Sequence, residues 1–313
     1  MLSFLLTRSP PPSSSSSLLS SHGLYGCPAL YSDQAGDLAS HGYVVLMVEH
    51  SDGSAPLASS AGGELIGHHK GIYKLRKDAS ANAPAAEWDT PAYVLGRRDQ
   101  IEVRIEEVIE AAGLAASLDS SDRPELAATG GVSFKNRLDV RDGGVHLCGH
   151  SYGGATVLGA AGRRPELFRS VAAHDPAVDW LSDDVRYNCF KGMKEEETDY
   201  FEKGSGGYRD ERKLVESKGL DSVPVCMIYC SQWQDWKFGH FWKTLPKISE
   251  GSLGKKGQSV GMVVRDCKHF EFSDNCLIQP AWLNRALDFC GTDPAMRSAE
   301  IKTETRNFMR RFD

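Results

Sequence analysis

Residues 147–156 read LCGHSYGGAT, a G-x-S-x-G pattern that follows the apolar run at 145–148 and precedes a small-residue segment typical of a helix. A serine hydroxyl is a weak nucleophile until a base takes its proton. On a sharp strand-to-helix turn the hydroxyl stands clear of the sheet, where such a base can reach it. The pattern therefore predicts Ser151 as a nucleophile, with Gly149 and Gly153 permitting the turn; a turn that serves packing alone is the alternative.

Strand-like and helix-like segments alternate along most of the chain. Buried strands are predicted at 43–48, 145–148, 171–173, 223–230 and 259–264, and helices at 33–40, 98–118, 152–162, 280–289 and 300–308. Such alternation predicts the α/β class, with a mostly parallel central sheet flanked by helices. A chain of 313 residues can form one domain of this class.

The helix predicted at 98–118 carries an apolar stripe at helical spacing, formed by Ile101, Ile105, Val108 and Ala112. A stripe of this kind predicts a helix that packs on the core. Off the stripe are three glutamates that we expect to be solvated: Glu102, Glu106 and Glu107.

A serine nucleophile needs a base and an orienting carboxylate, which follow it in the order Ser, acid, His after an elbow of this type. Asp175 comes directly after the strand at 171–173, at a strand end where α/β proteins place functional side chains. His269 lies on a loop shortly after the strand at 259–264. Nearby carboxylates and a histidine in an aromatic, helix-like stretch stay open as alternatives: Asp179, Asp183, Asp184 and His240.

Further short blocks appear in a fixed order around these residues. They read SHGL at 21–24, LYS at 30–32, DLASHG at 37–42, VEH at 48–50, GHSYGGAT at 149–156 and HFEFSD at 269–274. Together they resemble the platelet-activating factor acetylhydrolases of the lipoprotein-associated and cytosolic phospholipase A2 type. The resemblance implies an α/β-hydrolase fold with Ser151 as nucleophile, His269 as general base and Asp175 as the acid that orients it. It also implies an oxyanion hole built from the backbone amides of Leu24 and Tyr152.

The chain departs from that family in two places. The family has an aromatic residue two positions after the acid, where this chain has Ala177, and Asp179 follows closely, so Asp179 stays open as the acid. The family also has two or three strands ahead of residue 21, whereas residues 9–17 here are all proline or serine. We therefore expect a low-complexity N-terminus at 1–20 and a catalytic domain at 21–313, with residues 1–17 disordered or loosely attached. Either the chain is an incomplete copy, or its sheet lacks edge strands and anchors Leu24 weakly.

Composition excludes several classes of function. The net charge of −6, with no Lys/Arg block among aromatics, excludes a nucleic-acid partner. No apolar run approaches the roughly 20 residues that cross a bilayer. Eight cysteines without a Cys-x-x-Cys pair predict buried or free thiols in a reducing compartment, and we expect no functional secretory signal in the N-terminus as written. A cytoplasmic location is therefore expected, or secretion if the N-terminus is incomplete. His68 and His69 lack a third ligand, so no metal or cofactor is expected.

Aromatic residues between the acid and the base, at 187–201 and 233–242, suit an apolar acyl ester as substrate. The resemblance implies a serine-dependent, calcium-independent hydrolase that removes short or oxidised sn-2 acyl groups from platelet-activating factor-like glycerophospholipids. A membrane or lipoprotein surface is where such an enzyme would meet its phospholipid. The alternatives are a carboxylesterase of another substrate class, such as a polyester or dienelactone hydrolase, and a non-catalytic hydrolase-fold binding module.

Overall fold

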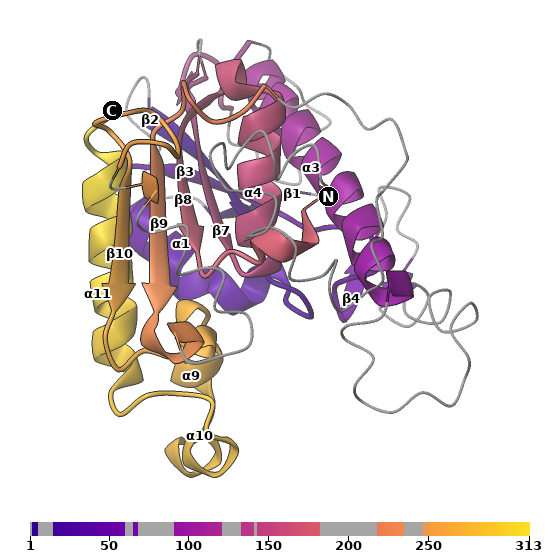
Figure 1. Cartoon of the computed structure of the whole chain (residues 1–313). Helices are drawn as coiled ribbons and strands as arrows, with labels where there is room; N and C mark the ends of the chain where they lie inside the picture. Colours follow the sequence, from indigo (N-terminus) through magenta and orange to yellow (C-terminus); the bar gives the residue numbers. More distant parts are fainter. Residues whose placement is uncertain are drawn as a thin grey trace.

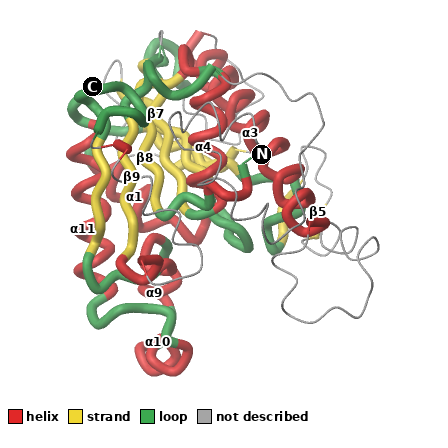
Figure 2. Tube along the Cα trace, viewed as in Figure 1, coloured by secondary structure: helices red, strands yellow, loops and turns green. Residues whose placement is uncertain are grey.

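The structure, a computed structural model, describes residues 2–5, 15–59, 65–67, 91–120, 133–140, 143–181, 218–234, 247–248 and 250–313. Figure 1 shows a twisted sheet between helices, and Figure 2 shows the same layers coloured by secondary structure.

The strands are β1 (Leu2–Leu5), β2 (Ser15–Ser21), β3 (Val44–Val48), β4 (Leu57–Ser59), β5 (Leu65–Gly67), β6 (Leu138–Asp139), β7 (Val145–His150), β8 (Phe168–His174), β9 (Val225–Cys230) and β10 (Val260–Val264). The α-helices are α1 (Ser32–Ser40), α3 (Pro91–Ser120), α4 (Tyr152–Arg163), α9 (Asn275–Ile278), α10 (Ala281–Leu287) and α11 (Pro294–Met309). Short 3-10 helices are η1 (Pro28–Tyr31), η4 (Pro165–Leu167), η5 (Val178–Trp180), η6 (Ser231–Gln234) and η7 (His269–Phe272).

The main sheet has the strand order β1-β3-β2-β7-β8-β9-β10, with the short β6 also paired to β2. β1 runs antiparallel to β3, and the neighbouring pairs from β3 to β10 are parallel. β4 and β5 form a separate antiparallel pair. The prediction of an α/β protein with a mostly parallel central sheet is confirmed.

β2 lies in the middle of this sheet, between β3 and β7, and pairs with both in parallel. Leu18 and Leu19 are fully buried. Serine side chains are small enough to be enclosed beside them, and the backbone hydrogen bonds of a strand do not depend on the side chain. The predicted loose attachment of residues 1–17 is therefore wrong for β1 and for residues 15–17, while residues 6–14 lie outside the described residues. The boundary expected at residue 20 falls inside β2.

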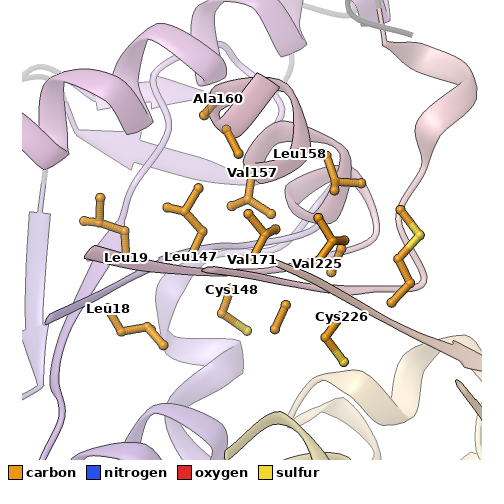
Figure 3. Packing of buried hydrophobic residues seen from close by; sticks show 14 of the residues in the cluster. Leu18, Leu19, Leu147, Cys148, Val157, Leu158, Ala160, Val171, Val225 and Cys226 are labelled. Atoms are coloured by element: carbon orange, nitrogen blue, oxygen red, sulfur yellow. The ribbon is translucent and has the colours of Figure 1, made fainter. Parts of the chain in front are cut away.

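The core occupies both faces of the sheet, because side chains alternate along each strand. Figure 3 shows the face toward α4, where neighbouring strands supply side chains at matching register: Leu19, Leu147, Val171 and Val225. The opposite face carries Leu18, Cys148 and Cys226. Burial on both faces explains why β3 and β9 have nearly continuous apolar sequences without alternation.

Helices α3 and α4 pack together on one face of the sheet, and α11 with α1 covers the other (Figure 1). The predicted stripe of α3 is confirmed: Ile101, Ile105 and Val108 are fully buried. The glutamates beside the stripe are not simply solvated, which corrects the prediction. Glu102 forms an ion pair with Arg163 of α4, and Glu107 contacts His50 just after β3, because both glutamates face other elements. Glu106 also pairs with Arg163, but its side chain is 54% exposed, so the prediction of a solvated side chain holds in part for this residue.

A disulfide joins Cys276 in α9 to Cys290 after α10, across a separation of 14 residues. The prediction of free thiols is wrong for this pair, because α10 folds back and brings together two cysteines whose spacing matches no motif. The described free cysteines are Cys27, Cys148, Cys226, Cys230 and Cys267, and Cys189 lies outside the described residues.

Five histidines are buried within the sheet and its C-terminal edge: His22, His50, His146, His150 and His174. Burial lowers the pKa of each of them below the usual value of a histidine, because a buried imidazole loses the solvation of its charged form. These buried histidines are therefore neutral at physiological pH.

Candidate active site

Ser151 stands on the turn between β7 and α4 with φ 57° and ψ −117°. Positive φ is strained for a residue with a side chain, and such strain gathers at functional sites. Two glycines let the backbones approach: a Cβ on Gly149 would lie 2.3 Å from the carbonyl oxygen of Gly153, and a Cβ on Gly153 would lie 2.1 Å from that of Ser21. The strand, turn and helix predicted around this serine are therefore present.

His269 lies between Ser151 and Asp175. Its Nε2 is 3.0 Å from Ser151 Oγ, and its Nδ1 is 3.0 Å from Asp175 Oδ2. Asp175 is fully buried at the end of β8, and its other carboxylate oxygen accepts a hydrogen bond of 2.8 Å from the amide of Cys230. An imidazole between a hydroxyl and a buried carboxylate is the arrangement that serine acyl transfer uses.

The alternatives considered from the sequence have different places. Asp179 lies in η5, and the structure does not describe its side chain. Asp183, Asp184 and His240 lie outside the described residues, as do the aromatic residues at 187–201 and 236–242 that were expected to select substrate. Among the described carboxylates considered as the acid, Asp175 contacts the His269 ring.

The ring of His269 is held between two others. Trp233 stacks on it, with centroids 4.1 Å apart and planes at 17°, and His150 lies with its ring centroid 4.6 Å away. The backbone amide of His269 donates to Gln232 Oε1 at 3.0 Å. These contacts limit the rotation of the imidazole while leaving 14% of its side chain exposed, so a substrate could reach it.

Residues 22–24 form the turn that directly follows β2, and we call this segment the oxyanion turn because it contains Leu24, which the resemblance predicts as an oxyanion donor. A Cβ on Gly23 would lie 3.3 Å from Ser151 Cβ, so the turn lies against Ser151. The Gly23 amide donates to the hydroxyl of Tyr31 at 2.9 Å, and that hydroxyl lies 2.9 Å from His150 Nδ1. The weak anchoring expected for Leu24 is therefore wrong, because a central strand and a buried tyrosine both hold this turn.

A family model described as "Platelet-activating factor acetylhydrolase, isoform II" matches residues 11–189 of the chain. The chain belongs to this family. The platelet-activating factor acetylhydrolase of Canis lupus familiaris is 29% identical over 193 residues, covering 55% of this chain and 33% of the relative. That of Cavia porcellus is 26% identical over 230 residues, covering 64% of this chain and 46% of the relative. The chain thus spans less than half the length of these relatives.

A solved structure gives the fold of this family member. A ferulic acid esterase from Streptomyces cinnamoneus superimposes with a TM-score of 0.53 at 17% identity, covering 97% of this chain and 68% of the esterase chain. At this identity the likeness concerns architecture alone. The predicted α/β-hydrolase fold is confirmed.

Several side chains around the family's elbow were missed by sequence reasoning. Tyr31 and His150 stand inside the blocks that carry the resemblance, but nothing in their spacing shows that they touch. Burial raises the pKa of Tyr31 well above its usual value, so its hydroxyl stays protonated and can bridge the two segments. The sequence does contain a sign that Arg104 has a special role, because it is a charged residue on the apolar face of α3 between Ile101 and Ile105.

The described residues contain no cluster of three or more His, Cys, Asp or Glu side chains arranged to hold a metal ion, and His68 and His69 lie outside them. None of the described helices has both the length and the apolar character needed to cross a bilayer.

Proposed function

We propose that this protein is a serine-dependent, calcium-independent esterase that removes short or oxidised sn-2 acyl groups from platelet-activating factor-like glycerophospholipids. One observation carries the proposal: His269 is 3.0 Å from both the hydroxyl of Ser151 and the carboxylate of Asp175. Membership of the platelet-activating factor acetylhydrolase family supports the choice of substrate.

Acylation begins when His269 Nε2 takes the proton of Ser151 and the freed oxygen attacks the ester carbonyl. Asp175 accepts from Nδ1–H and stabilises the imidazolium that results. The backbone amides of Leu24 and Tyr152 are the proposed donors to the oxyanion of the tetrahedral intermediate. Collapse breaks the sn-2 ester bond, and His269 returns its proton to the departing lysophospholipid oxygen.

Deacylation repeats these steps with water as the nucleophile. His269 takes a proton from the water, which attacks the acyl-enzyme, and the proton then returns to Ser151 Oγ as the short carboxylic acid leaves. Every charge that develops in this sequence has a proposed partner in Asp175 or in a backbone amide. The scheme therefore uses no calcium ion.

Several exposed apolar side chains lie on η7, α9 and α10, in the segment that includes and follows His269. Figure 1 shows β9 and β10 pointing toward these helices, with α10 projecting away from the sheet. We call this surface the apical patch, and its members are Phe270, Leu277, Ile278, Trp282 and Leu287. Trp282 is 69% exposed and Ile278 is 67% exposed. Exposed aromatic and aliphatic side chains on a short helix are suited to insert at a lipid–water interface, so we propose that the enzyme meets its phospholipid there.

The serine assignment is tested with Ser151→Ala, which should abolish hydrolysis of an acetyl phosphocholine ester and labelling by a fluorophosphonate. A butyryl and a long-chain phosphocholine ester compared with an aryl ester would separate a phospholipid hydrolase from a general carboxylesterase. Labelling that persists at another serine would refute the assignment, and an absence of both labelling and hydrolysis in the wild-type chain would favour a binding module.

The interfacial proposal is tested separately. Trp282→Ser with Ile278→Ser should weaken sedimentation with phosphatidylcholine vesicles and leave kcat on a water-soluble ester unchanged. Val103→Ser on α3 is the matched control, because Val103 is also exposed, at 44%, but lies outside the apical patch. Equal vesicle binding by all three proteins would contradict the proposal.

A cytoplasmic location remains a prediction. The disulfide between Cys276 and Cys290 favours the alternative, because disulfides persist in oxidising compartments and are rare in the cytosol. Alkylation of the protein in cells with a maleimide of known mass, before and after reduction, reports whether the bond is present where the protein resides.

A further inference from the structure

Arg104 is a fully buried arginine in the middle of α3. It stands on the apolar face of the helix, beside Ile101 and Ile105, where a side chain without charge would be expected. A buried guanidinium is tolerated only when its donors are paired. The groups that pair with Arg104 therefore show which parts of the chain its guanidinium holds in place.

Two of its contacts fix the oxyanion turn, and two more hold the loop after β3. Nη1 donates to the carbonyl oxygen of His22 at 2.7 Å, and Nη2 lies 3.2 Å from His22 Nδ1. Nη2 also donates to Ser54 Oγ at 2.6 Å, and Nε donates to Asp52 Oδ2 at 3.0 Å. Since Asp52 and Ser54 come from the loop after β3, one side chain ties the turn both to α3 and to that loop.

The same guanidinium reaches the other side of the site. It lies over the ring of Tyr152, 4.7 Å from the centroid, in a geometry that attracts a cation to an aromatic face. The hydroxyl of Tyr152 in turn donates to the carbonyl oxygen of Arg97, which lies about two turns before Arg104 in α3. Tyr152 is therefore held from both ends of its side chain by α3.

Arg104 thus contacts both residue segments that carry the amides proposed as oxyanion donors: the backbone of the turn that contains Leu24, and the ring of Tyr152, the first residue of α4. We propose that Arg104 is a positioning residue that sets the distance between these two amides, with Asp52 and Ser54 fixing the orientation of its guanidinium. This inference rests on the proposed esterase function and adds to it the part that aligns the oxyanion hole. Its loss should weaken binding of the tetrahedral intermediate more than binding of the substrate.

The test uses Arg104→Lys, with Ser54→Ala as a milder change that removes one acceptor of the guanidinium. Lysine keeps the charge but lacks the planar fork that bridges His22, Ser54 and Asp52. Arg163→Gln is the matched control: Arg163 is also a buried arginine at the contact of α3 and α4, but it pairs with Glu102 and Glu106 away from the turn.

For Arg104→Lys we expect kcat to fall about a hundredfold with little change in KM, because misplacement by about 1 Å can cost that much in rate. The affinity for a boronic acid that forms a tetrahedral adduct with the nucleophile should fall by the same factor. Ser54→Ala should show a smaller loss of both quantities in parallel, and Arg163→Gln should keep kcat and boronate affinity within about threefold of the wild type.

A purely structural role of Arg104 would lower stability without moving boronate affinity in step with kcat. Wild-type kcat and boronate affinity in folded Arg104→Lys would overturn the proposal. If that variant does not fold, wild-type values in Ser54→Ala overturn it instead. Hydrolysis that survives Ser151→Ala would overturn the proposed function itself, so the two failures are distinguishable.

Discussion

Replacing Gly153 with alanine would separate the oxyanion turn from the start of α4. A Cβ at this position would lie 2.1 Å from the carbonyl oxygen of Ser21 and 2.6 Å from that of His22. A carbon and a backbone oxygen approach no closer than about 3.3 Å in ordinary contacts. The neighbouring atoms are backbone, which cannot rotate away as a side chain can. The turn and the helix must therefore move apart by about 1 Å, a displacement that can reduce a rate about a hundredfold.

Stability should change much less than activity. Overpacking lowers the free energy of unfolding by about 1–3 kcal/mol. Exchanging glycine for alanine in a helix raises it by up to about 1 kcal/mol. Gly153→Ala should therefore fold, with a free energy of unfolding lowered by about 2 kcal/mol or less. Steady-state kinetics on an acetyl ester, together with urea denaturation, measure both quantities.

Gly113→Ala provides the control, because Gly113 is exposed on α3 and an added Cβ there meets nothing within 4 Å. That variant should be more stable by up to about 1 kcal/mol, with kcat unchanged. A kcat of folded Gly153→Ala close to the wild-type value would refute the close approach on which this reasoning depends.

Three further predictions concern the triad acid, the disulfide and the histidines. Asp175→Asn should lower kcat by about 10⁴-fold by fixing the wrong imidazole tautomer, whereas Asp179→Asn should change it little; the reverse ranking in steady-state kinetics would make Asp179 the acid. Reduction of the bond between Cys276 and Cys290 should lower the free energy of unfolding by about 3 kcal/mol, as expected for a closed loop of this size; equal urea midpoints with and without reductant would contradict this. The buried histidines have a lower pKa in the folded state than in the unfolded state, so their contribution to stability should be complete above their unfolded pKa of about 6.5. As the pH falls below that value, the free energy of unfolding should decrease by up to about 1.4 kcal/mol per pH unit for each histidine. Urea denaturation at pH 7.5, 6.5 and 5.5 measures this decrease, and equal free energies of unfolding at the three pH values would contradict the prediction.

The parts of the molecule that the sequence predicted depend on local signals. The elbow around Ser151 needs glycines within a few residues of it, and central strands such as β3 and β9 are buried on both faces and so appear as apolar runs. Asp175 and His269 could be selected because parallel strands end at one edge of a sheet, and the structure places His269 against Ser151 and Asp175 against His269.

The parts that the sequence did not predict depend on partners far away along the chain. β2 is a strand because β3 and β7 enclose it, and its serines carry no apolar pattern of their own. Cys276 meets Cys290 because α10 turns back, which spacing alone does not indicate. The role of Arg104 depends on His22 and Ser54, which precede it by many residues.

The central place of β2 also bears on how the proposed active site is assembled during synthesis. Residue 17 pairs with residue 145, so one edge of β2 stays unpaired until the ribosome has synthesised β7. At typical translation rates this wait is on the order of 10 s. β7 ends at His150, so the pairing of β7 with β2 also places Ser151 against the oxyanion turn. Non-local pairings of this kind form slowly. Regain of the proposed esterase activity on refolding should therefore coincide with the slow pairing of β2 with β7, and the exposed edge of β2 before that moment is where a chaperone would be most useful.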